Sequence, residues 1–271
     1  MHKTNCLNCG RSLTANQHFC SHCGQKADTR RFTFKQLLHD LFHSFIHVES
    51  GLFRLLKGLA LKPGQTAAAF VEGKRKTYFN PFTFLALCIA FTVFLNARIN
   101  PYPDLSVPDT QRLERMPDQR MREMYALTVQ RNGYIQEFSN QHLDILPLVV
   151  SPYFAFCLWL FFRRRNRNLA EITVAHVLYT AFITLLASIV ISPILALCRN
   201  TLAYYYVEYG SLALETLYVA WGFKTFFNFR NAGGYFKVLA VLAIGGIIGF
   251  ILLLVALAIY VYHGAWEVLN Y

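Results

Sequence analysis

The chain has 271 residues, of which 55% are hydrophobic and only 15% are charged, and its formal net charge is +11. Soluble domains average about 45–50% apolar and about 25% charged residues, so the composition excludes an ordinary soluble protein. The apolar residues form long runs that approach the roughly 20 residues a helix needs to cross a bilayer, which predicts an all-α polytopic membrane protein.

The first predicted element is a metal-binding module over residues 1–28. Its two CxxC pairs are Cys6 with Cys9 and Cys20 with Cys23. Two such pairs supply four thiolates, which complete the tetrahedral shell of a structural zinc site. A segment this short cannot bury a core, so the metal must supply its folding energy. We therefore predict a structural Zn²⁺ ion in a small zinc ribbon or knuckle.

Two disulfides are the alternative for these four cysteines, and they would require an oxidising compartment. Residues 1–33 are polar and lack the apolar run of a secretory signal. The other three cysteines, Cys88, Cys157 and Cys198, stand singly in apolar segments. Both features favour zinc over disulfides.

Residues 29–78 are predicted to form amphipathic interfacial helices followed by a basic anchor. An apolar stripe at helical spacing begins at Phe34, and His39, His43 and His47 follow one border of it. Histidines four residues apart on a helix can chelate a metal, but no glutamate completes the HExxH pattern of a metalloprotease here. We favour an interfacial role for these histidines over a second metal site.

The same segment continues with a short helix expected at Leu52–Leu61 and another at about Gln65–Gly73, because the intervening proline and glycine end helices. Lys74, Arg75 and Lys76 then stand directly before the first span. A basic cluster at that depth can bind anionic lipid headgroups, although its common role is a plain anchor on the cytoplasmic side.

Five membrane spans are predicted in residues 79–271. The fourth is the least apolar, because it contains Glu208, Glu215 and Lys224. Between the first two spans lies a polar external segment, 98–142, which we expect to be a helical hairpin broken at Pro117 and at Asn132-Gly133. The expected spans are 79–97, 143–162, 174–198, 202–227 and 236–262.

Positive charge alternates with these spans. Residues 1–78 contain twelve Lys or Arg and four acidic residues, whereas residues 98–145 contain six and seven. The positive-inside rule then places the N-terminus in the cytoplasm and the C-terminus outside. With four spans, every basic residue from Arg199 to Lys237 would lie outside, so five spans are favoured. The charge is a topology signal, and we expect no nucleic-acid partner.

Ionisable residues inside a membrane are candidate functional groups. Glu208 and Glu215 are seven residues apart and share a face of the fourth span, and His176 lies near the cytoplasmic end of the third. Glu208 is expected at the interface. Glu215 is therefore the best candidate for a polar site within the bundle.

Several motifs follow one another in a fixed order in the first hundred residues. They are made by Cys6, Cys9, Gly10, Cys20, Cys23, Gly24, Gln25, Lys26, Lys62-Pro63-Gly64, Gly73-Lys74-Arg75-Lys76, Tyr78, Asn80, Pro81 and Phe82. This order resembles a bacterial family of zinc-ribbon polytopic membrane proteins that has no established activity. The resemblance implies the architecture and a bacterial inner membrane, but no function. A looser resemblance, of topology alone, is to the Yip1-type five-span membrane proteins.

No GxGxxG, P-loop, GxSxG or HExxH pattern is present, so we predict no enzymatic activity. We expect a non-enzymatic membrane platform, whose cytoplasmic zinc module and amphipathic helix bind membrane lipids or a protein partner. The alternative is a small transporter or channel that uses Glu215 within the helix bundle.

Overall fold

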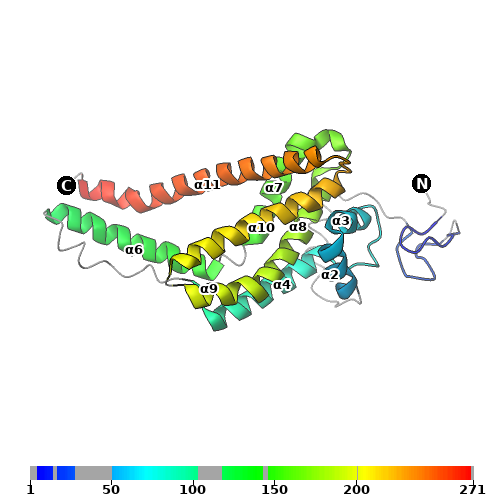
Figure 1. The fold of residues 1–271 in the computed structure, drawn as a ribbon, viewed down its shortest axis with the longest axis horizontal. Helices are drawn as coiled ribbons and strands as arrows, with labels where there is room; N and C mark the ends of the chain where they lie inside the picture. Colours follow the sequence, from blue (N-terminus) through cyan, green and yellow to red (C-terminus); the bar gives the residue numbers. More distant parts are fainter. Residues whose placement is uncertain are drawn as a thin grey trace.

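The computed structural model describes residues 5–14, 17–27, 51–102, 118–142, 146–199 and 201–269, and for 132, 136–142, 146 and 260–269 it describes the backbone alone. Within these ranges the regular elements are helices, with two isolated β-bridges near the N-terminus. The helices form an elongated bundle, with the N-terminal segment at one end and the end of the last helix at the other (Figure 1). The expected helix that carries His39, His43 and His47 lies outside the described residues.

Two short helices, α2 (Leu52–Leu61) and α3 (Pro63–Val71), form a hairpin at the end of the bundle nearest the N-terminal segment. We call this the module end. The helix predicted at Leu52–Leu61 is confirmed with the same bounds, and the next helix begins two residues earlier than expected. Pro63 explains both boundaries, since it lacks an N–H group and is well suited to the first turn of a helix.

The hairpin is fixed to α10 (Leu202–Phe226) by a close helix crossing. A Cβ atom added to Gly64 would lie 2.3 Å from the carbonyl oxygen of Gly222 and 2.5 Å from the Cβ of Thr225. The hydroxyl of Tyr218 also donates a hydrogen bond to the carbonyl oxygen of Leu59 at 2.9 Å. The α2–α3 hairpin therefore closes the module end of the bundle.

The centre of the bundle is α8 (Leu169–Leu186), which packs against both α4 (Pro81–Ile99) and α7 (Leu146–Phe162). Every residue from Ala170 to Phe182 is buried. The helix begins five residues before the predicted span, because Asn168 and Glu171 form a reciprocal capping box at its start.

A short π-helical segment, η4 (Ala187–Ile191), joins α8 to α9 (Ser192–Cys198). At this turn the buried hydroxyls of Thr92 on α4 and Ser188 share a hydrogen bond. Ser188 also donates to the carbonyl oxygen of Thr184 at 2.7 Å, and Thr92 donates to that of Cys88 at 2.9 Å. Hydroxyls paired in this way hold membrane helices together, so the contact between α4 and η4 is polar at this level.

Among the described residues, three helical stretches are long and apolar enough to cross a membrane: Pro81–Ile99, Leu169–Cys198 and Ala232–Ile259. Two further helices predicted as spans do not reach this standard. The first, α7, has only 17 residues, and α10 is less apolar because it contains Glu208, Glu215 and Lys224. In the part of the chain that the structure describes, the fold is helical and contains three candidate spans, and the five-span count stays a prediction.

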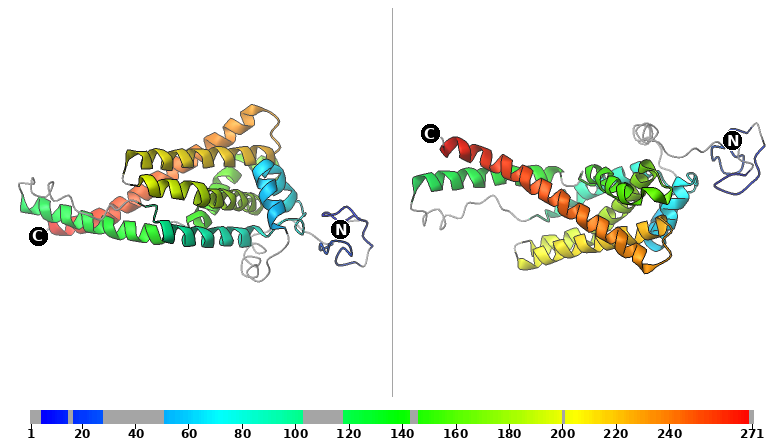
Figure 2. Two further views of the ribbon diagram at one scale, coloured as in Figure 1. Left: turned by 60° about the horizontal axis from the view of Figure 1, so that its bottom comes forward. Right: turned by 90° about the horizontal axis from the view of Figure 1, so that it is seen from above.

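In the described part of the polar segment, α6 (Gln119–His142) is one continuous helix, where a break at Asn132-Gly133 was expected. The reason is its partner, since the final helix, α11 (Ala232–Leu269), packs along both α6 and α7. Figure 2 shows α11 and α6 extending together beyond the rest of the bundle. A hairpin broken at residues 132–133 is therefore wrong.

Candidate metal centre

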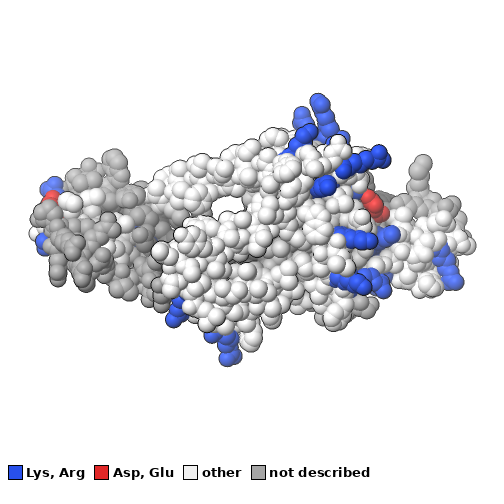
Figure 3. All heavy atoms as spheres, viewed as in Figure 1, with Lys and Arg blue, Asp and Glu red and all other residues white. Residues whose placement is uncertain are grey.

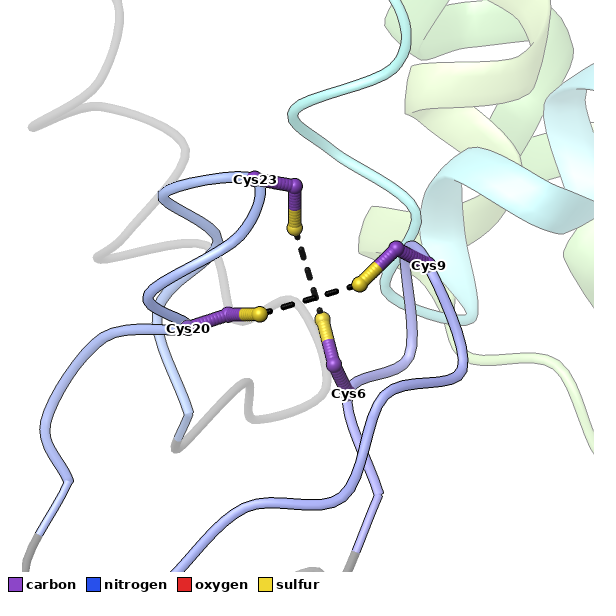
Figure 4. Close-up of side chains that lie close together, drawn as sticks. All are labelled: Cys6, Cys9, Cys20 and Cys23. Atoms are coloured by element: carbon purple, nitrogen blue, oxygen red, sulfur yellow. Dashed lines mark hydrogen bonds between the residues drawn. The ribbon is translucent and has the colours of Figure 1, made fainter.

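Four cysteine sulfurs converge near the N-terminus (Figure 4). The Sγ atoms of Cys6 and Cys23 are 3.6 Å apart, and those of Cys9 and Cys20 are 3.7 Å apart. All four lie within 4.8 Å of one another. These separations exceed the roughly 2.05 Å of a disulfide bond, and all four cysteines are free. The structure thus brings the four predicted ligands together around one point, where they could hold a metal ion.

The two CxxC loops that supply these sulfurs have the same backbone geometry. In the first, the N–H of Cys6 donates to the carbonyl oxygen of Arg11 and that of Gly10 donates to Cys6. In the second, the N–H of Cys20 donates to Gln25 and that of Gly24 donates to Cys20. Both glycines have a positive φ, 78° for Gly10 and 69° for Gly24, which other residues adopt at a cost.

Each loop is also closed by an isolated β-bridge, Asn5 with Ser12 and Phe19 with Lys26. The equivalent residues of the two loops are always fourteen positions apart. The metal centre is therefore built from two copies of one structural unit, a repeat that the sequence analysis did not recognise.

The protein environment treats the four thiols differently. Backbone N–H groups of Cys23 and His22 donate to the Cys20 sulfur and lower the pKa of Cys20 to about 6. The backbone of Arg11 favours the thiolate of Cys9 in the same way, but desolvation and the neighbouring sulfurs outweigh it and raise the pKa of Cys9 to about 11. Four adjacent thiols resist joint ionisation, and a bound cation removes that resistance.

Each CxxC loop also contacts the segment that leads into α4, residues 73–79, which we call the basic strap. The Oε1 atom of Gln25, a buried side chain, accepts a hydrogen bond from the backbone N–H of Lys76 at 3.0 Å. The Oδ1 atom of Asn8 accepts one from the N–H of Thr77 at 3.1 Å and another from its hydroxyl. The metal centre is thus docked on the bundle through one amide side chain from each loop.

The end of the basic strap that leads into α4 is also held in place. A Cβ atom on Gly51, at the start of α2, would lie 2.8 Å from the backbone N of Phe79, so the strap crosses directly over that glycine. Phe79 is fully buried, and Asn80 caps α4 by accepting hydrogen bonds from the N–H groups of Phe82 and Thr83. The strap therefore has little freedom between the metal centre and the membrane helix.

The predicted lipid-binding residues lie on this strap, with Lys74 and Lys76 exposed and Arg75 half-buried. Lys and Arg side chains gather at the module end of the molecule (Figure 3). Of the arginines there, Arg167 is engaged, because its Nη2 atom lies 2.6 Å from Glu72 Oε1 and its guanidinium lies 4.8 Å from the centre of the Phe226 ring. Together, the lysine and arginine side chains give this end a positive potential.

The structure does not bring the predicted intramembrane polar residues together. His176 is buried, its ring stacks on Phe154 at 5.7 Å, and its Nδ1 atom pairs with the hydroxyl of Thr180 at 3.1 Å. It also lies beside Phe223, which is eight residues from Glu215, or about 12 Å along the helix axis. Glu215 is half-buried, and no described residue pairs with its carboxylate. Glu208 is exposed, as expected for an interfacial residue.

Two contacts of the site could not be predicted from the sequence. The amide contacts of Asn8 and Gln25 join residues that are 69 and 51 positions apart, and no spacing pattern connects them. The only available signal was that Gln25 stands in the resemblance motif directly after the last CxxCG.

Comparison with protein families matches residues 49–93 to a family described as "Protein of unknown function (DUF3667)". The matched residues cover α2, α3, the basic strap and most of α4. They therefore include the surface on which the metal centre docks, but not the metal centre itself. Comparison with curated proteins and with solved structures gives no match. The resemblances to zinc-ribbon and Yip1-type membrane proteins stay predictions.

Proposed function

We propose that this chain is a multi-span membrane protein whose metal-loaded cysteine module forms a non-enzymatic cytoplasmic platform for a protein or lipid partner. The observation that carries the proposal is the docking of the module. Asn8 and Gln25, one from each CxxC loop, hold consecutive residues of the basic strap directly before α4. A folded module is thereby fixed against the membrane helices and presents one defined surface.

The metal that suits this centre best is Zn²⁺. A tetrahedral ion with Zn–S bonds of about 2.3 Å separates its sulfurs by about 3.8 Å, close to the 3.6 and 3.7 Å between the paired sulfurs. Four cysteine thiolates with no open position are typical of structural zinc, so the metal folds the module and does no chemistry.

For the membrane arrangement we propose five spans, with the N-terminus in the cytoplasm of a bacterium and the C-terminus outside its inner membrane. The helices α4, α7, α8–α9, α10 and α11 each have one end on the side of the bundle where the α2–α3 hairpin lies (Figure 1), and the connections there are rich in arginine and lysine. This distribution is what the positive-inside rule expects of a cytoplasmic end.

Affinity purification of the full-length protein from native membranes tests the platform. Three variants are compared with wild type: Cys6→Ser with Cys20→Ser, which lacks the metal; Asn8→Ala with Gln25→Ala, which keeps the metal but loses docking; and Gln17→Ala. Gln17 is the control, because among the described residues its side chain accepts a hydrogen bond only within the module, from the backbone N–H of Thr14.

We expect about one zinc ion per chain in wild type, in the docking variant and in the control, and none in the cysteine variant. Partners that co-purify with wild type and with Gln17→Ala should be lost from the other two. The same partners in all four samples would contradict the proposal.

A second candidate, a conduit for a small solute or ion, rests on Glu215. Its half-buried carboxylate lies on the side of α10 that carries the buried residues Tyr204, Val219 and Gly222, and an ionisable group at such a position is costly unless it has a use. Flux in reconstituted vesicles that disappears in Glu215→Gln would support it. Unchanged flux, or none in wild type, would exclude it.

A further inference from the structure

Two turns at the module end pack against each other through aromatic rings. One is the α7–α8 turn, residues 163–168, and the other is the α10–α11 turn, residues 227–231. The Phe162 ring, at the end of α7, lies 5.1 Å from that of Phe227 and 5.6 Å from that of Phe229. The guanidinium of Arg165 lies 4.1 Å above the Phe229 ring. The two turns therefore form one rigid surface.

The shape of the second turn is also fixed by packing. A Cβ atom on Gly234, in the first turn of α11, would lie 2.3 Å from the Cβ of Phe229. No side chain fits there, so the loop lies directly on the start of α11. This contact holds Phe229 under the guanidinium of Arg165.

The paired turns carry several free cations. Arg163, Arg164, Arg230 and Lys237 are exposed, and none forms a hydrogen bond or ion pair with another described residue. Residues 163–168 and 227–237 contain no Asp or Glu, and the nearby carboxylates are engaged elsewhere, Glu72 by Arg167 and Glu171 in the cap of α8. This surface therefore attracts anions, because no acidic side chain within it competes for its arginines and lysine.

Directly beside these cations the helices present apolar surface. Leu160 and Phe161, at the end of α7, are 49% and 62% exposed, and Phe236, at the start of α11, is 63% exposed. The two helices pack on each other. A molecule that binds here can place a negative charge on the arginines and a hydrocarbon chain on the phenylalanines in the same pose.

We infer that the paired turns bind an anionic phospholipid, with its phosphate between Arg163, Arg164 and Arg230 and its acyl chains along α7 and α11. Basic surfaces between membrane helices at the headgroup level are suited to such lipids. Free phosphate would satisfy the arginines alone and leave the exposed phenylalanines without a role. The site is separate from the metal centre and goes beyond the proposed platform.

The test uses full-length protein in phosphatidylcholine nanodiscs that contain a small fraction of spin-labelled phosphatidylglycerol, with spin-labelled phosphatidylcholine as the reference lipid. The test variant is Arg163→Gln, Arg164→Gln, Arg230→Gln. The matched control is Arg54→Gln, Lys57→Gln, Lys62→Gln, which removes the same charge from exposed side chains of α2 and of the residue that follows it, at the same end of the molecule. A third variant replaces the three arginines of the site with lysine.

Wild type should prefer the anionic lipid, and the glutamine variant should lose about fivefold in selectivity for each charge removed. The α2 control and the lysine variant should keep the wild-type selectivity. Equal losses in the test and control variants, a loss in the lysine variant, or displacement of the labelled lipid by millimolar inorganic phosphate would overturn the inference. Zinc content and partner capture are not expected to change, so this result is independent of the platform test.

Discussion

Gly64 is the residue at which the family-matched hairpin meets the membrane bundle. A Cβ atom added to Gly64 would lie 2.3 Å from the carbonyl oxygen of Gly222. The backbone there leaves no room for a methyl group. We expect Gly64→Ala to push α3 away from α10 and to destabilise the protein by about 1–3 kcal/mol. Thermal unfolding of the detergent-solubilised protein measures this loss.

Gly210 and Gly246 provide the control for that substitution. A Cβ atom at either position meets nothing within 4 Å, and both glycines lie inside helices. Alanine there should leave the unfolding temperature unchanged or raise it, since alanine favours a helix over glycine by up to about 1 kcal/mol. A Gly64→Ala protein as stable as these two would show that the crossing is not tight.

Tyr179 and Tyr218 offer a second comparison, because only one of their hydroxyls is paired. The hydroxyl of Tyr179 is fully buried and has no hydrogen-bond partner among the described residues, whereas that of Tyr218 donates to Leu59. An unpaired buried hydroxyl costs free energy. Tyr179→Phe should therefore be neutral or stabilising, and Tyr218→Phe should destabilise by about 1 kcal/mol.

The same unfolding assay in detergent checks this pair of substitutions. A clear loss of stability in Tyr179→Phe would mean that its hydroxyl has a partner, such as an ordered water, in the folded protein.

Among the helices and loops, the basic strap is the element most dependent on the metal centre. Without metal, the two CxxC loops lose the force that holds them together, and Asn8 and Gln25 leave their places. We expect a zinc chelator to speed hydrogen exchange at the amides of Lys76 and Thr77 by about fivefold, the equivalent of a hydrogen bond worth about 1 kcal/mol. Hydrogen exchange read by mass spectrometry checks this.

The amide of Phe84, which donates within α4 to Asn80, should exchange at the same rate before and after chelation. If the chelator also leaves the exchange rates of the Lys76 and Thr77 amides unchanged, the docking contacts do not depend on the metal.

Metal affinity should also depend on pH. The thiol of Cys9, whose pKa is raised to about 11, must give up its proton when the metal binds at pH 7. Cys20, with a pKa lowered to about 6, is already a thiolate there. Binding thus releases protons, so affinity should rise between pH 6 and pH 8 and fall steeply below pH 6, where Cys20 also becomes protonated.

Competition against a chromophoric zinc chelator across this pH range measures the change. An affinity that does not vary with pH would mean that the thiols are ionised before the metal arrives, contrary to the raised pKa of Cys9.

Local signals explain why some elements could be predicted from the sequence. Pro63 marks the boundary between α2 and α3, and Asn80 is followed by the proline that opens α4. The continuity of α6 through Gly133 had no local signal, because a glycine costs a helix only about 1 kcal/mol and the compensating packing comes from α11, about a hundred residues later. The cysteine ligands were recognisable from spacing alone, but their docking on the strap was not.

On the scale of the whole molecule, the question is how many helices cross the membrane. Five spans place the α10–α11 turn at Asn231 in the cytoplasm, whereas four spans place it outside. We expect a reporter fused after Asn231 to behave as cytoplasmic, as one fused after Asn166 should under either count. A fusion after Asp118 should behave as external under both.

Fluorescent-protein and alkaline-phosphatase fusions at these three positions read the two sides of the membrane. An external signal after Asn231 together with a cytoplasmic signal after Asn166 would remove α10 from the set of spans and reverse the side on which α11 ends.

The final helix, α11, is longer than the hydrocarbon core of a bilayer is thick. Its 38 residues extend about 57 Å at 1.5 Å per residue, well beyond the roughly 30 Å hydrocarbon core. Because α6 lies beside its far half and is largely polar, the two helices together can continue past the bilayer. This paired extension lies at the end of the molecule opposite the metal centre (Figure 1).

The repeated CxxC loops have a consequence for orientation. Because the loops are equivalent, a half-turn of the module about its own axis would exchange them and leave the metal shell unchanged. The contacts to the strap allow only one of these two orientations, because Asn8 and Gln25 are not equivalent residues of the two loops. The residue equivalent to Asn8 in the second loop is His22, and the residue equivalent to Gln25 in the first loop is Arg11. Swapping these two pairs of side chains should therefore turn the module over on an otherwise identical protein.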